Sequence, residues 1–211
     1  MCNARPTCFR LLRQCVLAAA SRTFCTAGTS KASFHPLVAF ADLEHALDAL
    51  HGATVALDGD ESLLPVLAEI AESVGARAVR LPEDGKAAYH AAAMMAAGGL
   101  VGLLDGVVSV ARLAGLDEKT ALAVYLPLAR QALANAERLG VDGALTGPFL
   151  RGDVGTVRGH LEVLRASAPE ALNLYVAVAR RELAIARRRG DLSEATAVQL
   201  TALLDEAEPG H

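Results

Sequence analysis

The sequence contains no tryptophan, few other aromatic residues and no cysteine beyond Cys25. A small secreted domain held by disulfides has cysteines throughout its fold, so their confinement to the N-terminal segment argues against such a core. The cysteine spacings, with no histidine nearby, match no common zinc site. A net charge of −4 provides no basic face for nucleic acid. We therefore expect neither a bound metal nor a nucleic-acid partner.

Several catalytic and nucleotide-binding motifs are also missing. The sequence has no G-x-G-x-x-G and no Walker A pattern, so no phosphate-binding loop can be assigned. It has no H-E-x-x-H and no G-x-S-x-G, the signatures of zinc proteases and of serine hydrolases. Nothing in these patterns indicates a hydrolase.

Residues 1–34 differ in composition from the rest of the chain. They contain five basic residues but no acidic residue, together with all four cysteines. An acid-free segment with Arg, Ser and Thr resembles a transit peptide, and an irregular N-terminal extension is the alternative. The apolar run 15–20 is too short for a secretory signal, so we expect a cytoplasmic protein.

Residues 35–82 alternate between predicted helices and strands. Asp42 can cap a helix to about residue 50, and the runs 53–60 and 77–82 are typical of short strands. Between them, apolar residues at helical spacing predict a helix over 61–75. This alternation predicts an α/β unit with a parallel sheet. Two strands do not form a stable sheet alone, so further strands must come from residues 1–34, from another chain or from a missing part.

Every segment after residue 83 is predicted to be helical. Small and aliphatic residues dominate this region, and glycine or proline marks most of the helix ends. We therefore place a domain boundary near residue 83 and predict a helical domain over 83–211. The expected helices span residues 86–113, 117–139, 153–166, 169–189 and 193–206.

The first of these segments approaches the composition of a membrane span. Residues 87–104 have no formal charge, but Tyr89 and His90 interrupt the apolar run. Glycines at positions 98, 102 and 106 lie on one face of a helix and let another helix approach closely. We expect a buried central helix of a soluble protein, with the membrane span as the alternative.

Lys86 and His90 are the first candidates for chemistry. They are four residues apart, so they share a face at the start of the long helix, next to the predicted domain junction. A lysine against an apolar wall can hydrogen-bond a carbonyl or transfer a proton. The alternative is a solvated lysine and a core histidine.

The stretch GPFLRGDVGTVRGH (147–160) contains the second set of candidates. Asp153 is a natural N-cap for the following helix, so its carboxylate is committed to backbone N–H groups and does not form an adhesion motif. Arg151 precedes this helix, and Thr156 and His160 share one of its faces. A helix start with a hydroxyl and a cation can bind a carboxylate or phosphate, and a simple capped helix is the alternative.

His35 is a weaker candidate. It precedes Pro36 at the predicted end of a strand, the edge at which α/β folds bind ligands. An ordinary loop histidine is the alternative.

Five motifs occur in an order that resembles a known family. They are SFHPLVAFAD, VALDGDE, DGKAAYHAAAMMAAGGLVGL, ALTGPFLRGDVGTVRGHLEVL and LYVAVAR. This succession resembles Rossmann-like oxidoreductases with a helical C-terminal domain of unknown function, which are described as NADP- or deazaflavin-dependent. The resemblance implies a Rossmann-like remnant over 35–82, with the glycine fingerprint and most of the cofactor domain expected before the chain begins.

The helical half is similar to the C-terminal domains of 6-phosphogluconate dehydrogenase, ketopantoate reductase and pyrroline-5-carboxylate reductase. By this resemblance, Lys86 and His90 take the place of a catalytic K-x3-N pair, with histidine replacing asparagine. Gly98 stands where many relatives have another asparagine. The turn before Thr156 is similar to a substrate-binding proline-glycine-threonine turn, and the resemblance implies a homodimer with interleaved helices.

These resemblances predict an NADP-dependent oxidoreductase-like protein, or its substrate-binding and dimerisation part. Hydride transfer to a C=O or C=N group of a small acid would place the substrate between Lys86 and His90 on one side and Arg151 and Thr156 on the other. Lys86 would polarise or protonate the reacting group, and Arg151 with Thr156 would bind its carboxylate, next to His160. The alternative is a non-catalytic helical dimerisation module that has lost cofactor binding.

Overall fold

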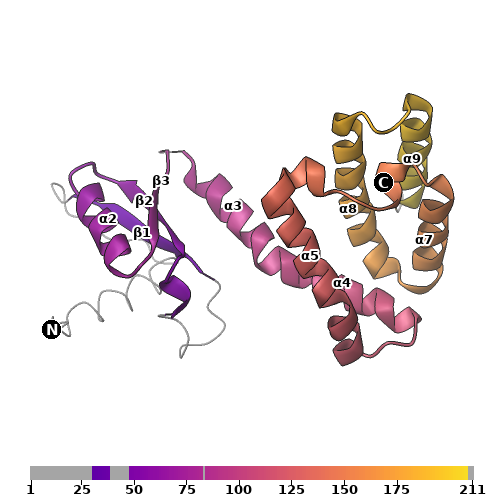
Figure 1. Ribbon diagram of the computed structural model, residues 1–211, viewed down its shortest axis with the longest axis horizontal. Helices are drawn as coiled ribbons and strands as arrows, with labels where there is room; N and C mark the ends of the chain where they lie inside the picture. Colours follow the sequence, from indigo (N-terminus) through magenta and orange to yellow (C-terminus); the bar gives the residue numbers. More distant parts are fainter. Residues whose placement is uncertain (1–29, 39–47, 83, 209–211) are drawn as a thin grey trace. The chain divides into compact units, whose positions relative to one another are not determined.

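A computed structural model of the chain describes residues 30–38, 48–82 and 84–208 (Figure 1). The chain divides into two compact units, of which the first ends at Ala97 and the second begins at Gly98. The boundary that the sequence suggests, near residue 83, stays a prediction. Each unit is described by itself.

The first unit contains a three-stranded sheet with one helix packed against it (Figure 1). The strands lie in the order β1-β2-β3, and β2 and β3 are parallel, as the alternating sequence pattern predicted. The elements of this unit are β1 (Ala32–Leu37), the 3-10 turn η2 (Asp48–Leu50), β2 (Thr54–Gly59), α2 (Leu64–Ser73), β3 (Arg77–Arg80) and α3 (Lys86–Ala96).

The core of the first unit explains why β2 and α2 form where they do. Val55, Ala56 and Leu57 are all buried in the central strand, as expected for a strand covered on both faces. Leu64 and Ala71 of α2 are buried together with Val55 and Leu57, so the helical apolar period faces the sheet. The helix predicted from Asp42 falls mainly on residues 39–47, which lie outside the described residues.

The sequence indicated a strand that ends at His35-Pro36, and β1 extends to Leu37. The sequence required additional strands, and β1 supplies one from residues 32–37, but it runs antiparallel to β2, with Phe34 opposite Leu57. His35 lies within β1, opposite Ala56, rather than at the end of a strand. The prediction of its position was wrong, because proline is tolerated in an edge strand and does not end this one.

The second unit is helical throughout its regular structure (Figure 1). The predicted helices after residue 113 are confirmed within a few residues, and one additional helical turn, α6, was not predicted. The helices are α4 (Gly98–Leu113), α5 (Glu118–Ala144), α6 (Pro148–Arg151), α7 (Val154–Ser167), α8 (Pro169–Arg189) and α9 (Glu194–Ala207). A non-helical Gly140, with φ of 71°, interrupts α5 at the predicted helix end.

Side-chain caps fix the starts of three helices. Asp117, Asp153 and Ser193 each accept a hydrogen bond from the backbone N–H three residues later. Gly190 ends α8 in the left-handed region, with φ of 75°, where other residues are strained. These ends were predicted from the sequence because capping depends on local residues.

The apolar run over 86–113 does not form one buried helix. It is divided at Ala97 into α3 and α4, and only 6% of its most apolar window is buried. The prediction of a buried central helix was therefore wrong for the part of the chain that the structure describes. The run is long and apolar enough to cross a membrane, a weak criterion that core helices of soluble proteins also meet.

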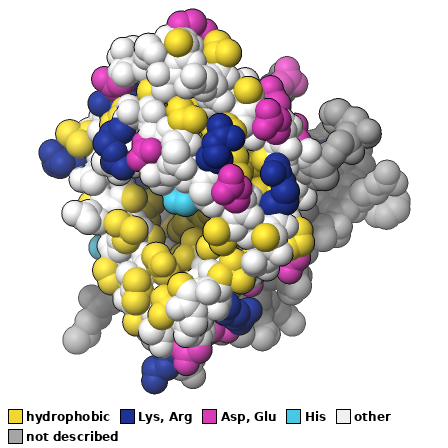
Figure 2. Space-filling model, turned by 90° about the vertical axis from the view of Figure 1, so that its right-hand side faces the viewer, with side chains coloured by type: hydrophobic (Ala, Val, Ile, Leu, Met, Phe, Trp, Pro, Cys, Tyr) yellow, Lys and Arg dark blue, Asp and Glu magenta, His cyan; other side chains and the backbone are white. Residues whose placement is uncertain are grey.

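Exposed hydrophobic side chains are numerous on the long helices. Met94 and Met95 of α3 are exposed, as are Val101 of α4 and Val124 and Leu128 of α5. Figure 2 shows hydrophobic side chains gathered around a hollow on one face of the molecule. Large exposed apolar patches are more common at interaction sites than on the rest of a protein surface.

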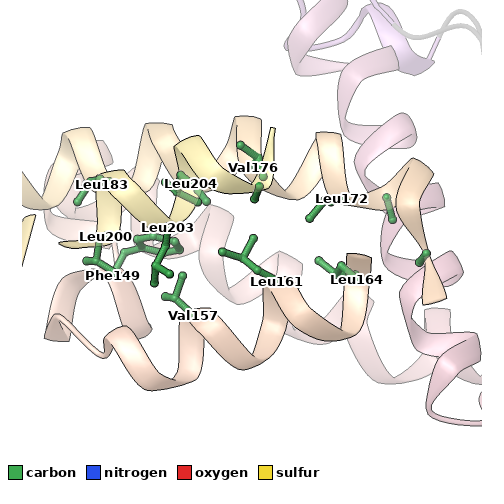
Figure 3. Packing of buried hydrophobic residues seen from close by; sticks show 14 residues of the cluster. Phe149, Val157, Leu161, Leu164, Leu172, Val176, Leu183, Leu200, Leu203 and Leu204 are labelled. Atoms are coloured by element: carbon green, nitrogen blue, oxygen red, sulfur yellow. The ribbon is translucent and has the colours of Figure 1, made fainter. Parts of the chain in front are cut away.

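The core of the second unit joins α6, α7, α8 and α9 (Figure 3). Phe149 from the short α6 is almost fully buried among leucines and valines of the other three helices. Leu161 of α7 and Leu200 of α9 come from opposite sides of this cluster. The chain turn that bears Arg151 and Asp153 is therefore anchored by Phe149.

Candidate functional site

Lys86 lies at the carboxyl edge of the parallel strands. It is the first residue of α3, and its Nζ atom lies 3.5 Å from Ser33 Oγ and 4.0 Å from Asp58 Oδ2. Asp58 is near the end of β2 and stands opposite Ser33 in the β1–β2 register. In α/β folds this edge is the usual place for ligands.

Two histidines and a tyrosine adjoin this lysine. The ring centroids of His35 and His90 are 4.4 Å apart with the rings nearly perpendicular, and Tyr89 lies 6.1 Å from His35. Two buried atoms, His35 Nδ1 and the Tyr89 hydroxyl oxygen, have no hydrogen-bond partner among the described residues. Unpaired buried polar atoms are uncommon, and a water molecule, an ion or a polar ligand can satisfy them. We call Ser33, His35, Asp58, Lys86, Tyr89 and His90 the Lys86 cluster.

The charges of the Lys86 cluster favour a neutral His35. Burial lowers the pKa of His35 most, and electrostatic interactions with His90 and Lys86 lower it further. Burial also raises the pKa of Tyr89. A neutral imidazole and a neutral phenol can each donate or accept a hydrogen bond, so the cluster offers several groups to a small polar molecule.

The structure brings three predicted site residues together in this cluster: His35, Lys86 and His90. Sequence reasoning missed Asp58 as a site residue, because Asp58-Gly59 reads as a strand end. Its position directly before that glycine, at the carboxyl end of a parallel strand, was the available signal.

Arg151, Thr156 and His160 belong to the second unit. Arg151 ends α6, and Asp153 caps α7 as predicted. The Thr156 backbone N–H donates to Asp153 Oδ1 at 3.0 Å, and the Thr156 hydroxyl donates to Oδ2 at 2.7 Å. These two bonds, the hydroxyl's first, lower the pKa of Asp153 below its usual value. A carboxylate of the protein therefore already occupies the helix start where we expected a ligand's acid group.

His160 makes a contact that the sequence did not indicate. Its Nδ1 lies 2.9 Å from the hydroxyl of Tyr175 on α8, and the two rings meet edge to face with centroids 5.8 Å apart. Burial, aided by the negative charge of Glu182, raises the pKa of Tyr175 to about 12. Tyr175 is therefore a neutral hydrogen-bonding group at physiological pH.

The two sets of predicted residues belong to different units. A shared role of the Lys86 cluster with Arg151, Thr156 and His160 stays a prediction. Among the described residues, no group of three or more metal-ligating side chains lies close enough to hold an ion.

The turns at the carboxyl edge do not suit a dinucleotide pyrophosphate. A glycine-rich loop and free backbone N–H groups normally bind it. Here Asp58 lies near the end of β2, and Asp60 and Glu61 follow the strand. Asp60 accepts a hydrogen bond from the Lys31 backbone at 2.6 Å, and Glu61 pairs with Arg80. Acidic side chains, rather than a glycine-rich loop with free backbone N–H groups, follow β2, so the described residues do not fit the diphosphate of NADP.

Comparisons with known proteins give related folds. Residues 53–182 match a family described as "Domain of unknown function (DUF2520)". A crystal structure of a protein from Thermotoga maritima is 31% identical, with a TM-score of 0.60, over 75% of this chain and 62% of that chain. One from Bacteroides fragilis, described as a "putative NADP oxidoreductase", is 18% identical with a TM-score of 0.60, over 85% of this chain and 73% of that chain.

A comparison with curated proteins found no match. The chain spans 62% of the length of the Thermotoga protein. At 18% identity, the Bacteroides structure supports a shared fold and not a shared function. Together these matches indicate a shared fold, in which a small sheet is followed by a helical domain.

Proposed function

The chain belongs to the family of the domain of unknown function DUF2520, and from this premise we propose that it is an oxidoreductase-like protein acting on a small acid. The Lys86 cluster supports this proposal most strongly. It combines an ammonium group, a carboxylate and two unpaired buried polar atoms at the edge of the sheet. We propose that a C=O or C=N group of the substrate binds there.

The residues of the cluster then have distinct roles. The Lys86 ammonium donates a hydrogen bond to the carbonyl oxygen or imine nitrogen and gives it a proton as the carbon is reduced. Asp58 lies close enough to orient the ammonium group and stabilise its charge. His35 and Tyr89 use their unpaired atoms to hold the substrate. In this class of reaction a nicotinamide supplies the hydride, and NADP enters this proposal by resemblance alone.

Binding of a small 2-oxo acid tests the proposal. Pyruvate titrated into the full chain is expected to shift the imidazole resonances of His35 and His90 in a saturable way, because both rings adjoin Lys86. Nuclear magnetic resonance of the histidine ring protons measures this, and the His51 ring serves as an internal control. If neither pyruvate nor a cyclic imino acid shifts His35 or His90, the site does not bind this class of substrate.

The alternative function is a helical dimerisation module without catalysis. The acidic turn after β2 favours it, because the described residues provide no place for a pyrophosphate. NADPH titration of the full chain, followed by nicotinamide fluorescence, distinguishes the oxidoreductase from the non-catalytic dimerisation module. Saturable binding would favour the oxidoreductase proposal, whereas no saturable signal at millimolar NADPH would favour the dimerisation module. Tight binding would show that the chain binds the cofactor. It would contradict the conclusion that the residues after β2 do not fit the diphosphate of NADP.

We also propose that two copies of the chain associate through the exposed apolar side chains of α4 and α5. Light scattering of the purified protein is expected to give the mass of a dimer. Val101→Glu places a charge on this surface and is expected to weaken the dimer at least about tenfold, since a buried unpaired charge is costly. Val101 is 67% exposed and Val163 of α7 is 54% exposed, so Val163→Glu is a matched control. A monomeric wild-type protein would contradict this proposal.

A further inference from the structure

A cavity of about 300 Å³ lies among α4, α5 and α8 within the second unit. Its α8 wall consists of residues spaced three or four apart, including Ala171, Tyr175, Val178 and Glu182. Gly106 forms part of the α4 wall, and a Cβ atom there would lie 2.5 Å from Leu174 Cδ2. The missing side chain lets α4 and α8 approach each other, and the volume is in the range of small-molecule sites.

The lining is apolar except for two tyrosines and one acid. Tyr175 presents a hydroxyl that His160 already holds at 2.9 Å, so its position is fixed. Glu182 lies two helical turns farther along the same face of α8. The cavity therefore has an apolar body and a polar side formed by Tyr175 and Glu182.

Glu182 has no partner of its own among the described residues. It makes no hydrogen bond or ion pair there, and burial raises its pKa. Three arginines of α8 pair with other acids: Arg180 with Asp205 and Glu208, Arg188 with Asp142 and Arg189 with Asp191. Arg181 and Arg187 form no ion pair with Glu182. A half-buried carboxylate without a counter-charge is costly, and a cationic donor from outside would offset that cost.

We propose that this cavity binds a compact apolar amine, with its hydrocarbon part against α4 and α8 and its ammonium group at Glu182. Charge complementarity selects the amine over an alcohol or an acid of the same shape. A carboxylate ligand would be repelled by Glu182. This site lies wholly within the second unit, and it does not depend on the function proposed for the Lys86 cluster.

Cyclohexylamine, cyclohexanol and cyclohexanecarboxylate are suitable probes, because they share one apolar ring and differ in the polar group. Titration of the full chain at neutral pH, followed by calorimetry and amide resonances, is expected to show saturable binding of the amine on α4 and α8. Cyclohexanol is expected to bind more weakly, and the carboxylate not at all. Glu182→Gln is expected to weaken cyclohexylamine binding about tenfold and to leave cyclohexanol binding unchanged.

Two further variants complete the test. Val178→Phe fills the cavity and is expected to remove binding of both the amine and the alcohol. Glu162→Gln, at an exposed position of α7, is expected to change nothing, and circular dichroism checks that each variant is folded. Equal binding of amine and alcohol, or an unchanged affinity in Glu182→Gln, would overturn the proposal. An absence of amine binding would also overturn the proposal. Side chains of a second copy that fill the cavity would produce that result.

Discussion

Replacing Phe149 with alanine is expected to lower the free energy of unfolding of the second unit by about 3–5 kcal/mol. Phe149 is only 2% exposed and packs among buried residues of α7, α8 and α9 (Figure 3). Removing its ring leaves a cavity that these three helices fill only in part. The loss also loosens α6, the turn that ends at Arg151 and leads to the Asp153 cap.

Amide hydrogen exchange of α7–α9 measures this effect for the second unit alone. A denaturation curve of the whole chain combines two units and does not give one free energy of unfolding. Val163→Ala, which removes two methyl groups from an exposed position of α7, is the matched control and is expected to change stability by less than about 0.5 kcal/mol. Equal protection factors in Phe149→Ala and wild type would show that α6 is not part of the core.

Replacing Lys86 with methionine is expected to remove the proton donor of the proposed reaction while keeping the fold. In a preparation that reduces a small acid, kcat is expected to fall by about 10²–10⁴-fold, the usual effect of losing a positioned acid. The pKa of His35 is expected to rise toward its ordinary value, because a neighbouring positive charge is lost. His90→Asn is expected to raise the His35 pKa further, since His90 lowers it more than Lys86 does.

Proton resonance titration of His35 measures both shifts without a substrate. Lys119→Met changes an exposed lysine in the first turn of α5 and is the matched control, with no shift expected at His35. A His35 pKa that is the same in wild type, Lys86→Met and His90→Asn would contradict the contacts of the Lys86 cluster. If kcat is unchanged but the His35 pKa is altered, the contacts of the Lys86 cluster are supported, and Lys86 is not the proton donor.

The helices of the second unit could be predicted closely from the sequence because their ends depend on local residues. Asp117, Asp153 and Ser193 cap helices where short polar residues precede apolar periods. The short α6 was missed, since its four residues follow a glycine and contain proline, a pattern typical of a loop. Its helical turn depends on the burial of Phe149, which is a tertiary contact.

The candidate site could be predicted only in part. His35, Lys86 and His90 were selected from their types and spacing, and the structure places them together. Asp58 could not be assigned to this site from the sequence, because its position opposite Ser33 depends on the register between β1 and β2. The sequence did not indicate Glu182 and Tyr175 as site residues, because a tyrosine and an acid seven residues apart are common on a helix.

The amino-acid sequence by itself determined strands β2 and β3, the helices after residue 113 apart from α6, and the helix caps. All of these depend on residues that are close along the chain. Tertiary structure alone decided the direction of β1, the exposure of the apolar run 86–113 and the cavity at Glu182. Periodicity shows which face of an element is apolar, but packing between distant segments decides whether that face is covered.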